Sequence, residues 1–69
     1  MNPEELKKLT KYFRKVFNND TAVAKSRPQK KDSAELYIAD EFVGVIYRDD
    51  EDGELSYNFS MAILEMDLE

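Results

Sequence analysis

Five acidic residues stand close together around one glycine in the second half of the chain: Asp49, Asp50, Glu51, Asp52 and Glu54. Such a cluster could hold calcium in an EF-hand loop, which needs acids at its first, third and fifth positions, glycine at its sixth and Glu at its twelfth. With Gly53 at the sixth position, Arg48 falls at the first and Phe59 at the twelfth, so both ends fail. Asp52-Gly53 is instead a favoured dipeptide for a two-residue type I′ turn. We predict a hairpin turn and no metal site.

Catalysis would have few residue types to use in this chain. There is no His and no Cys, and no glycine-rich phosphate loop, so acid–base or nucleophilic chemistry would depend on Asp, Glu, Lys or Tyr. The acidic residues described above lie at a predicted turn, where nothing excludes water. We therefore expect a protein that is not an enzyme, with no catalytic residue and no cofactor.

Basic residues gather near the beginning of the chain: Lys7, Lys8, Lys11, Arg14 and Lys15. At about 100° per residue these five share one face of a helix. A basic face could follow the phosphates of a nucleic acid or meet a protein partner. Most charged helix faces are simply solvated, however, and no nucleic-acid-binding motif accompanies this one.

The helix that carries these cations has a clear start. Asn2 is a favoured N-cap, Pro3 suits the first helical position, and Glu5 completes a capping-box spacing. An apolar stripe at helical spacing follows: Leu6, Leu9, Phe13, Val16 and Phe17. The pattern predicts a helix over about residues 3–17, ended by the Asn18-Asn19-Asp20 stretch.

Four later segments have the alternation or the β-branched content of strands: about residues 21–27, 33–39, 42–48 and 55–64. The first is weakly apolar and ends at Pro28, which indicates an edge strand. Residues 29–32 read as a polar loop, and the acidic end of the chain after residue 64 is expected to fray.

The turns decide which residues face each other. The Asp52-Gly53 turn would set Ile46 opposite Phe59, and would pair Gly44 with Met61 and Phe42 with Ile63.

The turn near residue 40 has two alternatives. A two-residue turn at Asp40-Glu41 would place Leu36 and Ile38 with Val43 and Val45. We prefer a three-residue turn, Ala39 to Glu41, because it places them with Phe42 and Ile46, the more strongly apolar set.

These elements predict an α+β fold in which an N-terminal amphipathic helix packs on one face of an antiparallel β-meander of three or four strands. The expected core gathers the apolar residues of the helix and of one sheet face: Leu6, Leu9, Phe13, Val16, Phe17, Leu36, Ile38, Phe42, Ile46, Tyr57, Phe59, Met61 and Ile63.

The strand over residues 42–48 is apolar on both sides, although a strand buried on one side should alternate with polar residues. One helix cannot cover both faces, which leaves four residues on the other: Tyr37, Val43, Val45 and Tyr47. Aromatics there could stack on nucleic-acid bases, but in a small domain they favour a protein interface. We expect a homodimer through this face, or else an unidentified protein partner. The alternative function is association with nucleic acid through the basic helix face.

Length and charge set further bounds. The chain has 69 residues and a net charge of −5, and one small domain of this size buries too little surface to be very stable alone. Residues 1–31 hold nine Lys or Arg against three acids, whereas residues 32–69 hold one Arg against twelve acids.

No apolar run is long enough for a membrane span and no leader pattern opens the chain, so we expect a cytoplasmic protein that does not enter membranes.

Two stretches of the chain carry a family resemblance: NPEELKKLTKYFRKVF and KKDSAELYIADEFVGVIYRDDEDGELSYNFSMAILEMDLE. Together they resemble a family of short alphaproteobacterial proteins catalogued as a domain of unknown function. The most specific part is DEFVGVIYRDDEDGELSYNFSMAIL. The resemblance implies a small bacterial α+β domain of about this length, and it implies no activity, substrate or catalytic residue.

Overall fold

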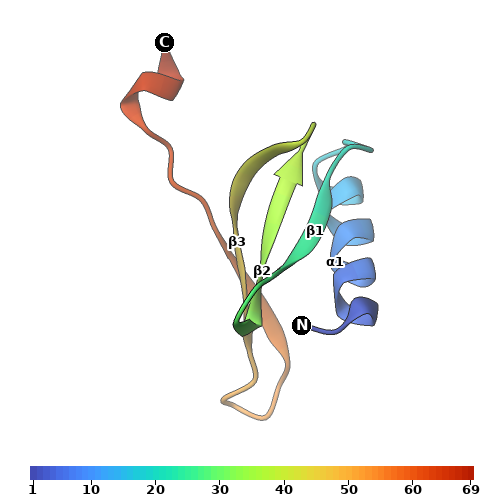
Figure 1. Cartoon of the computed structure of the whole chain (residues 1–69). Coiled ribbons are helices and arrows are strands. Elements are labelled where there is room, and N and C mark those ends of the chain that lie inside the picture. The colour runs from blue at the N-terminus through green and yellow to red at the C-terminus, as the bar shows by residue number, and fades with distance from the viewer.

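One helix precedes an antiparallel sheet in the computed structural model, which describes residues 1–69. The elements are α1 (Pro3–Val16), β1 (Val23–Arg27), β2 (Lys30–Ile38), β3 (Glu41–Asp49), β4 (Ser56–Ser60) and a short 3-10 helix, η1 (Glu65–Leu68). The strands lie in the order β1-β2-β3-β4, each antiparallel to the next. Figure 1 shows α1 against one side of this sheet. The predicted α+β fold is confirmed, with the weak first strand at one edge.

Helix α1 begins with the predicted capping box. The Asn2 side chain accepts a hydrogen bond from Glu5 N at 2.8 Å, and the Glu5 carboxylate accepts one from Asn2 N at 3.3 Å. The helix ends at Val16, and Asn18 takes the left-handed conformation with φ of 51°. Both ends therefore follow from residues that satisfy backbone groups the helix itself leaves free.

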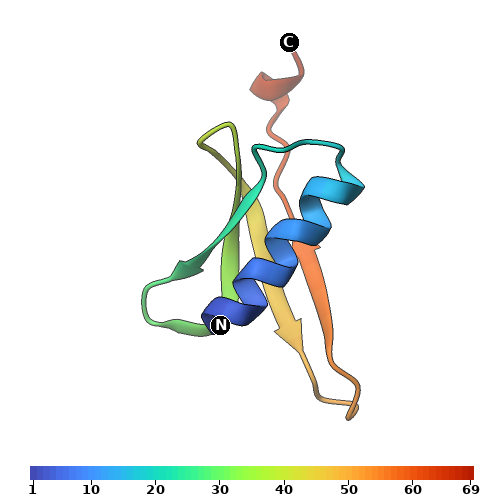
Figure 2. The same ribbon diagram turned by 90° about the vertical axis from the view of Figure 1, so that its right-hand side faces the viewer.

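The helix is held against β1 by its polar side chains. Thr10 Oγ1 accepts a hydrogen bond from Ala24 N at 2.9 Å, and Arg14 Nε donates one to the Ala22 carbonyl oxygen at 2.7 Å. Small side chains allow this close approach, because Ala22, Ala24 and Ala34 are all buried beneath the helix. Figure 2 shows α1 crossing the sheet diagonally. The helix therefore stays close to the β1 edge and leaves the β4 side partly open.

The connection between β1 and β2 is shorter than predicted. Arg27 pairs with Lys30, and Pro28-Gln29 make the turn, with Gln29 in the left-handed region at φ of 65°. Strand β2 therefore begins at Lys30, and the polar residues predicted to form a loop extend the sheet instead.

The β2–β3 hairpin turns at Ala39-Asp40, so neither predicted turn is correct. Both residues are left-handed, with φ of 52° and 65°, as a two-residue type I′ turn requires. A bulge follows: Tyr37 pairs with Phe42 while Leu36 pairs with Gly44, which leaves Val43 as the extra residue.

The turn and the bulge together exchange the sides of two predicted residues. Phe42 shares the side of Tyr37, with ring centroids 5.8 Å apart, and it is 51% exposed rather than in the core. Val43 packs against the core and does not share the side of Tyr37 as predicted. Beyond the bulge, Leu36 and Ile46 are both buried on the helix side, as predicted.

Strands β3 and β4 have the predicted register, with Ile46 opposite Phe59. The Phe59 ring lies over Gly44, where a Cβ would come within 2.7 Å of the ring and 2.6 Å of the Ser60 carbonyl oxygen. Only glycine leaves enough space at this position.

The loop between β3 and β4 is longer than the predicted two-residue turn and covers residues 50–55. Gly53 N donates a hydrogen bond to the Asp50 carbonyl oxygen at 3.2 Å, and Gly53 is left-handed with φ of 79°. A tight turn would have set Glu51 directly opposite Glu54, and like charges in that position destabilise a hairpin. Because the loop is symmetric about Asp52-Gly53, the register is unchanged.

Strand β4 ends at Ser60, so the predicted pairing of Met61 and Ile63 with β3 is wrong. The bulge at Val43 bends β3 at the point where the pairing would have continued. All side chains from residue 61 onward are exposed, and Figure 1 shows this C-terminal segment (residues 61–69) extending away from the sheet.

The core is small and lies between α1 and the sheet. Eight predicted core residues are buried or pack against the buried cluster: Leu6, Leu9, Phe13, Leu36, Ile38, Ile46, Tyr57 and Phe59. Five others are exposed, contrary to prediction: Val16, Phe17, Phe42, Met61 and Ile63. The last turn of α1 lies over the open β4 side, which explains the exposure of the first two.

Candidate functional site

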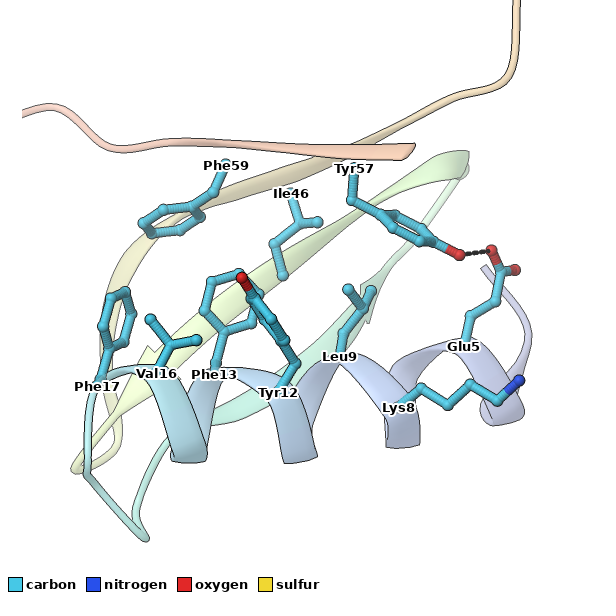
Figure 3. A pocket seen from close by; sticks show the side chains of 10 residues that line it. All are labelled: Glu5, Lys8, Leu9, Tyr12, Phe13, Val16, Phe17, Ile46, Tyr57 and Phe59. Carbon is cyan, nitrogen blue, oxygen red and sulfur yellow. Dashed lines mark hydrogen bonds between the residues drawn. The ribbon is translucent and has the colours of Figure 1, made fainter. Parts of the chain in front are cut away.

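An open groove of about 570 Å³ lies between α1 and β4, on the side of the helix away from β1. Eight of its ten lining residues are apolar or aromatic: Leu9, Tyr12, Phe13, Val16, Phe17, Ile46, Tyr57 and Phe59. Glu5 and Lys8 complete it. Figure 3 shows the helix side chains and the side chains of Tyr57 and Phe59 pointing toward one another across it. The volume and the lining are typical of a surface that binds another molecule.

Aromatic rings close the groove at the end of α1. The Phe59 ring lies 5.3 Å from the Phe13 ring and 6.3 Å from the Phe17 ring, measured between centroids. Along the outer wall, Tyr12 and Val16 are more than half exposed. The groove therefore presents apolar surface to solvent rather than enclosing it.

A polar cluster closes the other end of the groove. The Tyr57 hydroxyl donates a hydrogen bond to Glu5 Oε2 at 2.8 Å, and Arg48 Nε lies 3.6 Å from the same oxygen. Arg48 Nη2 also lies 3.8 Å from Asp50 Oδ2. The cluster joins the first turn of α1 to both strands of the last hairpin, a contact between residues 52 positions apart in the sequence.

The same contacts set the protonation of this cluster. The hydrogen bond from Tyr57 is the main reason that the pKa of Glu5 lies below 4.5, with help from the Asn2 amide and the Arg48 charge and against the effect of burial. Burial and the bond to Glu5 raise the pKa of Tyr57 above 10.0. At neutral pH the pair is a neutral phenol and a carboxylate, an arrangement that supports structure.

The face of the sheet opposite the helix carries a second apolar surface, which we call the far face: Tyr37, Phe42, Val45 and Tyr47. Leu36 and Ile46 are buried on the helix side, so their neighbours Tyr37, Val45 and Tyr47 point to the opposite side of the sheet. Phe42 lies on that side as well, because it pairs with Tyr37. Three of the four predicted interface residues therefore lie here, with Phe42 in place of Val43.

Two charged residues flank the far face. Lys25 Nζ lies 4.6 Å from the centroid of the Tyr37 ring, and the Tyr37 hydroxyl donates a hydrogen bond to Glu35 Oε1 at 3.0 Å. The bond to the Glu35 carboxylate raises the pKa of Tyr37 above 10.0. A cation and an anion thus stand beside one aromatic ring.

The predicted basic face is exposed at all five positions: Lys7, Lys8, Lys11, Arg14 and Lys15. Both ion pairs of the chain involve Arg48, so none of these cations is paired. The structure gives two of them further roles, since Arg14 bonds to the Ala22 carbonyl oxygen and Lys8 lines the groove.

The acidic residues of the β3–β4 loop do not converge on a point, and no three Asp or Glu in the chain stand close enough together to hold a metal ion. Asp49, at the end of β3, and Asp50, in the loop, make local backbone contacts instead. Asp49 Oδ1 accepts a hydrogen bond from Glu51 N at 3.2 Å, and the Asp50 carbonyl oxygen accepts one from Gly53 N.

Sequence reasoning missed the groove. Tyr12 was assigned neither to the apolar stripe nor to the basic face, although it lies three residues after Leu9 and four before Val16. Glu5 was identified only as a cap, and its bond to Tyr57 has no local signal in the sequence.

None of the helices has the length and apolar character needed to cross a membrane.

A family model described as "Protein of unknown function (DUF3126)" matches residues 5–67. Comparison with curated proteins and with solved structures finds no match to this chain. The matched range includes the groove, the far face and most of the C-terminal segment. The chain therefore belongs to the DUF3126 family of proteins of unknown function.

Proposed function

We propose that this protein is a non-enzymatic interaction module that self-associates through the far face. The observation that supports this proposal is the apolar surface that one helix leaves uncovered on the opposite side of the sheet. Phe42 and Tyr47 are about half exposed there. Tyr37 lies opposite Phe42 on β2, and Val45 lies between Phe42 and Tyr47 along β3. Exposed aromatics grouped with aliphatic residues are typical of protein interfaces.

A second copy of the chain suits this face because of its charges. Lys25 and Glu35 are direct cross-strand partners and stand on the same side of the sheet as Tyr37. Across a two-fold axis, the Lys25 of each copy can approach the Glu35 of the other, so that one patch complements itself. The small core supports the same conclusion, because association buries surface that a domain of this size cannot bury alone.

The variant Tyr47→Lys tests the proposal. Tyr47 is half exposed and its hydroxyl makes no hydrogen bond, so the substitution should leave the fold intact. Placing a charge in the interface should weaken association at least about tenfold. Sedimentation velocity over a range of concentrations measures this change, and circular dichroism reports the fold.

Leu55→Lys is the matched control, because Leu55 is also about half exposed and lies in the β3–β4 loop, outside the far face. It adds a similar charge and should leave association unchanged. Equal association of wild type and Tyr47→Lys would rule the far face out as the interface.

The alternative is a protein that associates with nucleic acid through the basic face of α1. It is favoured by the five exposed cations, none of which is paired with an acid. Replacing Lys7, Lys11 and Lys15 by Glu should then abolish retention on immobilised DNA or RNA at low salt, and Arg14 is kept because it supports the fold. Retention unchanged by the triple replacement would exclude this face, and no retention of the wild type would exclude the alternative as a whole.

A further inference from the structure

Two apolar features of the molecule are left exposed to solvent in a single copy. One is the groove between α1 and β4, with Tyr12 and Val16 exposed along its wall. The other is the C-terminal segment, in which Ile63 is 64% and Met66 is 72% exposed. We propose that the groove of one copy binds the C-terminal segment of a second copy, so that two chains exchange these segments.

Charge complementarity supports this assignment. In the C-terminal segment, Glu65, Asp67 and Glu69 alternate with apolar residues, and the segment contains no Lys or Arg. Along the outer rim of the groove, Lys8 lines the site, and Lys11 and Lys15 follow three and seven residues later on the same side of α1. The apolar side chains of the segment can therefore enter the groove while its carboxylates meet the lysines.

The direction of the chain favours a second copy over the chain's own groove. Figure 1 shows the C-terminal segment continuing away from the sheet after β4. To enter its own groove the chain would have to reverse immediately after Ser60. Residues 61–66 contain none of the residues that favour a tight reversal, which are Gly, Pro, Asn, Asp and Ser. Exchange between two copies needs no reversal. A single two-fold axis then places the C-terminal segment of each copy in the groove of the other.

Two variants on opposite partners of this contact test the proposal in the full-length chain. Tyr12→Glu, the groove variant, places a negative charge on the groove wall. Ile63→Lys with Met66→Lys, the segment variant, places positive charges in the C-terminal segment. The affected side chains are all more than half exposed, so each variant should fold, and circular dichroism checks this. Each variant alone should weaken the exchange contact at least about tenfold in sedimentation velocity.

Mixing the two variants gives the decisive result. The mixture contains one intact groove, from the segment variant, and one intact segment, from the groove variant. With Tyr47→Lys added to both variants to remove the far-face contact, we therefore expect the mixture to form mixed dimers at concentrations where each variant alone does not. If the mixture stays as dissociated as its components, or if neither variant weakens association at all, exchange between copies is wrong.

A distance measurement provides a second test that does not depend on the variants' affinity. The chain has no Cys, so Glu69→Cys gives one site for a nitroxide label. In a mixture of labelled chain and isotope-labelled wild type, the label should broaden the amide signals of Tyr12 and Val16 in the wild-type copy. Broadening confined to the chain that carries the label would show that the segment folds back on itself and would overturn the proposal.

The far face and the groove lie on opposite sides of the sheet, so the two proposals can be separated. Tyr47→Lys should leave the exchange contact intact, and the segment variant should leave the far-face contact intact. Loss of association in only one of these variants identifies the surface responsible. If association persists in both, the chain that combines Tyr47→Lys with the segment variant decides: its dissociation shows that both surfaces contribute, and undiminished association rejects both.

Discussion

The hydrogen bond between Tyr57 and Glu5 connects the first turn of α1 to β4. Glu5 caps α1 with one carboxylate oxygen and accepts from Tyr57 with the other. A single side chain therefore fixes the start of the helix and its position over the last hairpin. Charged acceptors make stronger hydrogen bonds than neutral ones, so this bond should contribute to stability mainly while Glu5 is ionised.

The variant Tyr57→Phe should therefore lose stability in a pH-dependent way. At pH 7 we expect a loss of about 1 kcal/mol in the free energy of unfolding. Because the folded-state pKa of Glu5 lies below 4.5, its contribution is present above that value and is lost as the pH falls through the folded pKa. The difference between variant and wild type should consequently shrink toward about pH 3. Urea unfolding at both pH values measures it.

Tyr47→Phe provides the control for this experiment, because it removes a tyrosine hydroxyl that makes no hydrogen bond in the structure. It should leave the free energy of unfolding unchanged at both pH values. A penalty for Tyr57→Phe that is equal at pH 7 and pH 3 would mean that the ionised carboxylate does not strengthen the bond.

At the scale of elements, the position of α1 creates the groove. Thr10 and Arg14 bond to the backbone of the segment that enters β1, and Ala22 and Ala24 leave room for the helix to approach it. A helix held at one edge cannot also cover the opposite edge of a four-stranded sheet. The open side next to β4 is therefore a consequence of small residues in β1 and just before it.

The elements themselves were predictable because their signals are local. The capping box of Asn2 and Glu5 set the start of α1, and the symmetry of the acidic loop about Asp52-Gly53 preserved the register of Ile46 with Phe59. The bulge at Val43 was not predictable in this way, since it depends on how the Ala39-Asp40 turn fits the ladder beyond it.

The turn and the bulge together explain the errors in the sites predicted on β3. The Ala39-Asp40 turn set Phe42 opposite Tyr37 on the far face, and the bulge turned Val43 toward the core. A slip of one residue exchanges the two sides of a strand, and a bulge does this locally without changing the rest of the register. The groove was missed for a related reason, because it depends on where a helix crosses a sheet.

The charge distribution of the whole molecule agrees with association between copies. Five of the ten Lys and Arg residues lie on α1, and seven of the fifteen acids lie in the β3–β4 loop and the C-terminal segment. The two regions are separated in one chain, because the C-terminal segment extends away from the helix (Figure 1). When segments are exchanged, the acidic part of one copy meets the basic part of the other.

The stability of the whole molecule should therefore depend on its concentration. Only nine of 69 residues are buried in one copy, so association through the far face, the groove or both would supply much of the missing burial. For a dimer that unfolds to separate chains, a tenfold rise in concentration should increase the apparent free energy of unfolding by about 1.4 kcal/mol. Urea midpoints measured over a hundredfold range of concentration test this. The dependence should vanish in a chain that combines Tyr47→Lys with the segment variant, and a wild-type midpoint that does not change with concentration would show that one copy is stable alone.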